Sequence, residues 1–166
     1  MLKVADFGCA DYYCGDKLYE YVKGTFMYHP PEKLIKYGHF ALPVDMWSLG
    51  CILNDLLQTG SLFMGYDETN QLELITGYCG SINLQWPEVS EHVARFYPSL
   101  PKNYQRLVRE RFGSFTSDSF ILELLDKLLE VNPSRRWSCR AALTFMKKNY
   151  LDETTELQLA KDSNWS

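Results

Sequence analysis

The sequence has no strong excess of charge and no long hydrophobic run. Its 17 Lys and Arg residues against 21 Asp and Glu residues give a net charge of −4, which does not favour binding to nucleic acid or to an anionic membrane. No apolar stretch approaches the roughly 20 residues that a membrane-spanning helix needs, and the first residues show no signal-peptide pattern. We therefore expect neither nucleic acid nor a membrane among its partners.

Paired cysteines are also missing. The five Cys residues form no CxxC pair, and the three His residues are scattered away from them, so the spacing does not predict a zinc site. An odd number of Cys without a secretory signal favours reduced thiols, and hence an intracellular protein of the nucleus or cytoplasm. Neither an internal repeat nor a low-complexity tract is present. The remaining composition, 46% hydrophobic over 166 residues, is that of one globular domain with a core.

The chain begins with an apolar run, residues 2–5, that ends in Asp6, Phe7 and Gly8. This pattern predicts a short β-strand that delivers a carboxylate to a tight turn. Residues 9–23 carry polar, charged and Tyr residues without a period, so they predict a loop. The run Gly-Thr-Phe-Met-Tyr-His-Pro-Pro-Glu follows at residues 24–32, and its two prolines are typical either of a rigid wall or of a helix start.

These two motifs, in this order and at loop distance, resemble the activation segment of eukaryotic protein kinases, here residues 6–32. The resemblance implies that Asp6 binds the Mg²⁺ that bridges the phosphates of ATP. It also implies that Phe7 packs into the core and that Gly8 permits the turn, so that residues 6–8 form part of the cofactor site. Thr25 would hydrogen-bond the catalytic base and help to hold the substrate hydroxyl, and Glu32 would close the segment.

The same segment contains three candidate regulatory residues. Kinases similar to the cyclin-dependent group carry a phosphorylated Thr near position 20, where this chain has Tyr19, Glu20 and Tyr21. A glutamate could stand in for phosphate, or a tyrosine could be the modified residue. The alternative is that none of the three is regulatory.

Residues 43–60 predict the central helix, because Met46, Leu49, Leu53 and Leu56 recur at helical spacing, with a proline at the start and a glycine at the end. The stretch is apolar on more than one side, which predicts a well-buried helix. It resembles the DxWSxGxxL helix of the kinase large lobe. Asp45 would there accept hydrogen bonds from the catalytic loop, so we expect it to have incomplete partners in this chain.

Residues 61–112 are similar to the insert of the CMGC kinase group, which includes the cyclin-dependent kinases, and this insert often docks partner proteins. The alternative is a spacer of loops and helices. The insert also contains Lys102, Arg106, Arg109 and Arg111. These residues predict either a solvated helix face or a site for an acidic docking partner.

A second helix is predicted over residues 117–131, capped by Thr116 or Ser117. The following residues resemble the kinase motif DPxxRxTxxxAL, in which Ser138 caps the next helix and Arg136 pairs with Glu32. Residues 117–150 would be the closing helices. Residues 151–166 are polar and predict an exposed tail.

Taken together, the resemblance implies a mainly α fold: a partial kinase domain over residues 1–150, the large lobe, with a short strand and a long activation segment at its start. The complete kinase would transfer phosphate from ATP and Mg²⁺ to Ser and Thr hydroxyls of a protein substrate. The ATP-clamping Lys, the Gly-rich loop and the His-Arg-Asp loop do not occur in these 166 residues, so we expect this chain alone to be inactive and not to bind ATP tightly.

Three explanations of such a chain stay open. It is a fragment or truncated gene form of an active kinase, which the strand at its first residues favours. Alternatively, it is a non-catalytic, pseudokinase-like binding or scaffold module that acts through the insert 61–112. The third explanation is a decayed relic that folds poorly.

Overall fold

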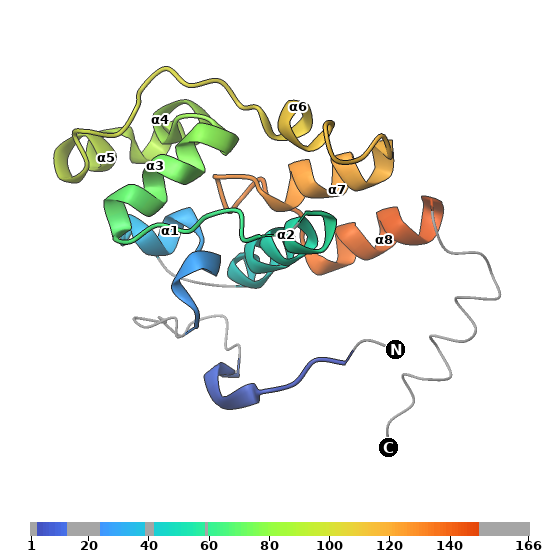
Figure 1. Cartoon of the computed structure of the whole chain (residues 1–166). Coiled ribbons are helices and arrows are strands. Elements are labelled where there is room, and N and C mark those ends of the chain that lie inside the picture. The colour runs from blue at the N-terminus through green and yellow to red at the C-terminus, as the bar shows by residue number, and fades with distance from the viewer. Residues whose placement is uncertain (1–2, 13–23, 39–41, 59, 150–166) are drawn as a thin grey trace.

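The computed structural model describes residues 3–12, 24–38, 42–58 and 60–149 (Figure 1). All regular elements in these ranges are helical, and they are numbered along the chain together with three short 3₁₀ turns. They are η1 (Phe7–Cys9), η2 (Phe26–Tyr28), α1 (Pro31–Leu34), α2 (Pro43–Leu57), α3 (Glu68–Cys79), α4 (Ile82–Gln85), η3 (Pro87–Val89), α5 (Ser90–Phe96), α6 (Val108–Phe112), α7 (Ser119–Leu128) and α8 (Cys139–Asn149).

The mainly helical architecture is confirmed, but the short strand expected at the start is not seen. Residues 3–6 form neither helix nor strand, and no β-strand occurs anywhere in the described ranges. A strand persists only when a neighbouring strand satisfies its backbone groups. The described part of the chain offers the segment no such neighbour, and Figure 1 shows it lying apart from the helices.

Helix α2 lies at the centre of the helical body (Figure 1). Its Trp47 is fully buried and stacks on Phe63, with the ring centroids 5.8 Å apart. At Gly50, an added Cβ would lie 3.0 Å from side-chain atoms of both Leu128 and Leu129. Glycine therefore allows α2 and α7 to approach closely, and this contact forms the heart of the core.

One face of α2 is more exposed than the predicted well-buried helix. Leu49 and Ile52 are each 45% exposed and Leu56 is 76% exposed, and their spacing places them on one side of the helix. The helix also ends at Leu57 rather than at Gly60, because Gln58 is already extended. Its start at Pro43 is as the sequence predicts.

The caps of the two C-terminal helices differ in how well the sequence predicts them. Asp118 caps α7 by accepting hydrogen bonds from the backbone N–H groups of Phe120 and Ile121, so the expected cap at Thr116 or Ser117 is wrong. An ionised carboxylate is a stronger acceptor at this position than a hydroxyl. Ser138 does cap α8, with its Oγ 3.2 Å from the N of Ala141. No helix in the described ranges is long and apolar enough to cross a membrane.

Candidate functional site

The turn at Asp6 is formed by local contacts. Asp6 lies in the left-handed region, with φ 60° and ψ 69°, and its Oδ1 lies 3.4 Å from the N of Gly8, whose N–H it accepts. The strained residue is thus Asp6, whereas the sequence analysis placed the conformational freedom at Gly8. Gly8 allows its backbone to lie close to the Asp6 carboxylate, because an added Cβ would lie 3.3 Å from the same Oδ1.

Phe7 does not take the core position that the resemblance implied. Its side chain is 68% exposed, because no described element packs against η1. Asp6 is also exposed. As a hard oxygen ligand it suits Mg²⁺, but no group of three His, Cys, Asp or Glu side chains in the described ranges is arranged to hold a metal ion. Among the described residues, Asp6 is therefore a single candidate ligand for Mg²⁺, and its role in binding the metal stays a prediction.

The end of the expected activation segment is fixed firmly to α2. Tyr28 Oη donates to Asp55 Oδ2 at 3.0 Å, and Ser48 Oγ donates to the carbonyl of Tyr28 at 3.2 Å. The hydrogen bond to Asp55 is the main reason that the pKa of Tyr28 is raised. Thr25 precedes this anchor; it is exposed and its hydroxyl caps nothing in η2.

A buried glutamine also holds this segment. Gln71, on α3, donates through Nε2 to the carbonyl of Met27 at 3.2 Å and accepts at Oε1 from the N–H of Gly65 at 2.7 Å. Its side chain is fully buried, so both polar ends need these partners. No role was predicted for Gln71 or Asp55: Asp55 lies on the predicted central helix 43–60, and Gln71 lies in the insert 61–112, for which no helix bounds were predicted.

His29 lies between the segment and α1. Lys33 Nζ donates to His29 Nε2 at 2.6 Å, and the ring of Phe26 packs edge-on against the imidazole at 5.5 Å. Burial, followed by the positive charge of Lys33, lowers the pKa of His29. The imidazole therefore accepts a hydrogen bond as the neutral form.

The structure brings Glu32 and Arg136 together across 104 positions of sequence. Arg136 Nη1 and Nη2 donate to the two carboxylate oxygens of Glu32 at 2.8 and 2.9 Å. The side chains are 0% and 3% exposed. The guanidinium also donates to the carbonyls of Pro43 at 2.7 Å and Glu130 at 3.0 Å, and it lies 5.1 Å from the ring centroid of Trp47. This network ties the segment to α2 and to the turn that follows α7.

The other predicted site residues are not part of this network. Asp45 lies in the first turn of α2 and is exposed, and no described residue donates a hydrogen bond to its carboxylate. No hydrogen bond or ion pair in the described ranges joins Asp6 to Thr25, Asp45 or the Glu32–Arg136 pair. The candidate regulatory residues lie outside the described residues, as does the polar tail: Tyr19, Glu20, Tyr21 and 151–166.

Three of the four basic side chains between positions 102 and 111 of the insert contact other groups of the chain. Lys102, Arg109 and Arg111 are exposed, so the expected solvated face is wrong for Arg106 alone. Arg106 is largely buried, donates to Asp126 Oδ1 at 2.9 Å and also donates to the carbonyl of Leu129 at 3.1 Å. Arg109 is ion-paired with Glu123 and Asp126, and the guanidinium of Arg111 lies 4.4 Å from the ring centroid of Tyr78. Acidic residues of α7 therefore satisfy much of this charge.

Residues 1–150 match the family of the protein kinase domain. The chain belongs to the protein kinase family. Its relatives include cyclin-dependent kinases: it is 38% identical to Cyclin-dependent kinase 12 of Caenorhabditis elegans over 156 residues, which is 93% of this chain and 21% of that protein. It is also 34% identical to Cyclin-dependent kinase 9 of Homo sapiens over 142 residues, 82% of this chain and 38% of that protein.

A solved structure gives the same answer for the fold. The crystal structure of the yeast RNA Pol II CTD kinase CTDK-1 complex contains a chain that matches with a TM-score of 0.64 and 31% identity, covering 72% of this chain and 40% of that one. This chain thus spans between 21% and 40% of the lengths of these three matched proteins.

Proposed function

We propose that residues 1–150 form the large-lobe part of a CMGC-like, ATP-dependent Ser/Thr protein kinase, from the activation segment to the closing helices. The observation that carries this proposal is the buried Glu32–Arg136 pair. A bidentate pair at this depth holds one end of the segment rigidly. Positioning of a substrate is most of what a protein kinase contributes to phosphoryl transfer.

The remaining roles follow from this assignment. In the complete kinase, ATP would supply the phosphoryl group and Mg²⁺ would neutralise the charge of its phosphates, and Asp6 would hold the metal through its carboxylate. Thr25 would lie beside the catalytic base, with its exposed hydroxyl directed to the substrate. Asp45 would accept hydrogen bonds from the catalytic loop, which explains why its carboxylate has no donor among the described residues. Tyr19, Glu20 and Tyr21 stay candidates for regulation.

The exposed side of α2 supports the same assignment. An exposed apolar stripe runs along α2 and consists of Leu49, Ile52 and Leu56. Solvent-facing helices of a complete domain rarely carry such a stripe. We infer that the remaining part of the kinase domain covers this stripe. The aligned regions cover only 21% to 40% of the matched proteins, which leaves ample chain for that purpose.

The 166-residue chain alone is proposed to be inactive, because it has neither the catalytic base nor the phosphate clamp of the kinase template. The purified chain, incubated with radiolabelled ATP, Mg²⁺ and a general protein substrate, is expected to transfer no label. Transfer that depends on Mg²⁺ and is abolished in Asp6→Ala would contradict this proposal.

A docking role for the insert 61–112 is the second proposal, and it does not depend on catalysis. It would apply equally to a scaffold module, the alternative to a kinase fragment. The observation that favours it is a pocket formed entirely by residues of the insert. An intracellular location, in the nucleus or cytoplasm, is proposed for either role.

A further inference from the structure

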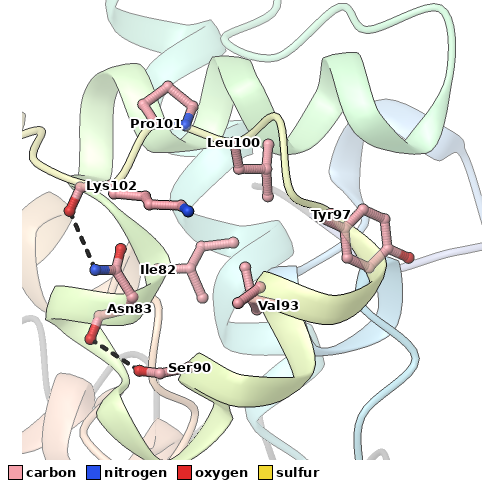
Figure 2. A pocket seen from close by; sticks show the side chains of 9 residues that line it. Ile82, Asn83, Ser90, Val93, Tyr97, Leu100, Pro101 and Lys102 are labelled. Carbon is pink, nitrogen blue, oxygen red and sulfur yellow. Dashed lines mark hydrogen bonds between the residues drawn. The ribbon is translucent and has the colours of Figure 1, made fainter.

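A cavity of about 200 Å³ lies between α4, α5 and the loop residues 100–102 (Figure 2). Its inner wall is apolar, because Ile82, Val93 and Leu100 line it and each is at most 6% exposed. Asn83 and Lys102 lie at its polar side (Figure 2). The cavity therefore has an apolar inner wall and a positively charged residue at its edge.

We propose that this cavity docks an extended segment of a partner protein, with one bulky apolar side chain inside it and an adjacent carboxylate on Lys102. The proposal names the chemistry of the partner and so rests on the docking role proposed for the insert. It does not rest on phosphoryl transfer.

The size of the cavity argues for a side chain rather than a metabolite. Sites for small organic ligands usually have about 300–1,000 Å³, and this cavity is smaller. A peptide needs only an anchor pocket, since one buried apolar or aromatic side chain provides much of the binding free energy.

The polar groups around the cavity argue for an apolar occupant. Asn83 Nδ2 donates to the carbonyl of Lys102 at 3.1 Å, and Ser90 Oγ donates to the carbonyl of Asn83 at 3.4 Å (Figure 2). Tyr97 Oη donates to the carbonyl of Leu34 at 2.9 Å. These donors are used within the chain, so they fix the walls and offer little to a polar ligand. Fixed walls also reduce the entropy lost on binding.

The charge at the margin argues for an acidic neighbour. Lys102 is the one Lys, Arg, Asp or Glu among the lining residues. It is exposed, and no acidic side chain in the described part of the chain forms a salt bridge with it. Its ammonium group faces the same space as the side chain of Ile82 (Figure 2). A carboxylate placed beside the apolar anchor would therefore meet a complementary charge, which sets specificity and association rate.

The test begins with an array of immobilised decapeptides in which two adjacent central positions are varied among apolar, acidic, basic and small residues. The labelled full chain should retain peptides with an apolar residue next to an acidic one. Retention without this preference, or a preference for basic residues, would overturn the proposal.

Variants then locate the binding by fluorescence anisotropy with the best peptide. Ala94→Trp should fill the cavity and weaken binding about 10-fold or more. Lys102→Glu should weaken it about 5-fold. The matched control Lys148→Glu makes the same charge change on α8 and should stay within about twofold of the wild type. Equal effects of the two Lys variants would show a long-range charge effect and contradict the assignment.

A second measurement covers the case in which Ala94→Trp does not fold. Titration of the wild-type chain with the same peptide should shift the methyl NMR signals of Ile82, Val93 and Leu100, and unmoved signals would place the peptide elsewhere. Sedimentation that shows dimers lost in Ala94→Trp would mean that a second copy occupies the cavity, which also overturns the proposal. None of these assays uses ATP, so their failure would leave the kinase assignment intact.

Discussion

Replacement of Arg136 by Met should destabilise this chain more than almost any other single change. The substitution leaves the Glu32 carboxylate, 3% exposed, without either of its two donors at 2.8 and 2.9 Å. It also removes the donor to the carbonyl of Pro43. Removing one partner of a buried ion pair costs about 3–5 kcal/mol. A domain of this size has only about 5–15 kcal/mol of unfolding free energy, so a large share would be lost.

Urea denaturation followed by far-UV circular dichroism measures this loss as a shift of the midpoint at constant slope. Arg135→Met is the matched control, because Arg135 is exposed and adjacent; it should change the unfolding free energy by at most about 0.5 kcal/mol. Arg136→Lys keeps the charge but not the two-pronged geometry, so it should fall between the two.

The double variant Glu32→Met with Arg136→Met distinguishes the cost of an unpaired buried carboxylate from the cost of lost packing. It removes the stranded carboxylate, so it should be more stable than Arg136→Met alone. An Arg136→Met midpoint equal to that of Arg135→Met would refute the reasoning. A double variant less stable than the single one would do so as well, since the cost could not then come from an unpaired charge.

Three further predictions concern other parts of the fold. Burial lowers the pKa of His29 below its ordinary 6.5, so the unfolded chain binds the proton first and stability falls as the pH drops below about 6.5; His29→Gln should flatten this part of the pH profile, and an unchanged slope would argue against it. Gly65→Ala should cost about 1–3 kcal/mol, because a Cβ would lie 2.6 Å from atoms of α3, whereas Gly77→Ala, with open space at its Cβ, should be neutral or stabilising in thermal melts. Burial raises the pKa of Cys79 to about 12 and that of Cys51 higher still, so peptide mapping after brief iodoacetamide treatment should find both unmodified. The exposed thiols in the same experiment should be labelled: Cys9 and Cys139.

The sequence predicted the elements whose determinants are local or carried by a long motif. Pro43 opens α2 because a proline at the first helical position loses no hydrogen bond, and Ser138 caps α8 for an equally local reason. The pairing of Glu32 with Arg136 followed from the kinase motifs. No rule of spacing joins residues so far apart in sequence, so the residues alone would not have predicted that pair.

The predictions that were wrong share one physical cause: whether a residue is buried or exposed depends on which other residues pack against it. Residues 2–5 were expected to form a short strand and Phe7 to pack into the core, but Phe7 is exposed. Arg106 was expected in solvent, yet the carboxylate of Asp126 and nearby carbonyls draw it inward. Helix α2 was expected to be well buried, and its Leu56 is exposed.

The central claim is that this chain carries the substrate-positioning half of a kinase, and one rate tests it most directly. The segment of human Cyclin-dependent kinase 9 that precedes the residue aligned with Asp6 would be joined to Asp6 of this chain, and the chimera would be assayed in the presence of a cyclin. The chimera should transfer phosphate from ATP to a protein substrate, and Asp6→Asn should lower the initial rate at least about 100-fold. A chimera that folds and binds ATP but transfers nothing, or one that is unaffected by Asp6→Asn, would contradict the claim.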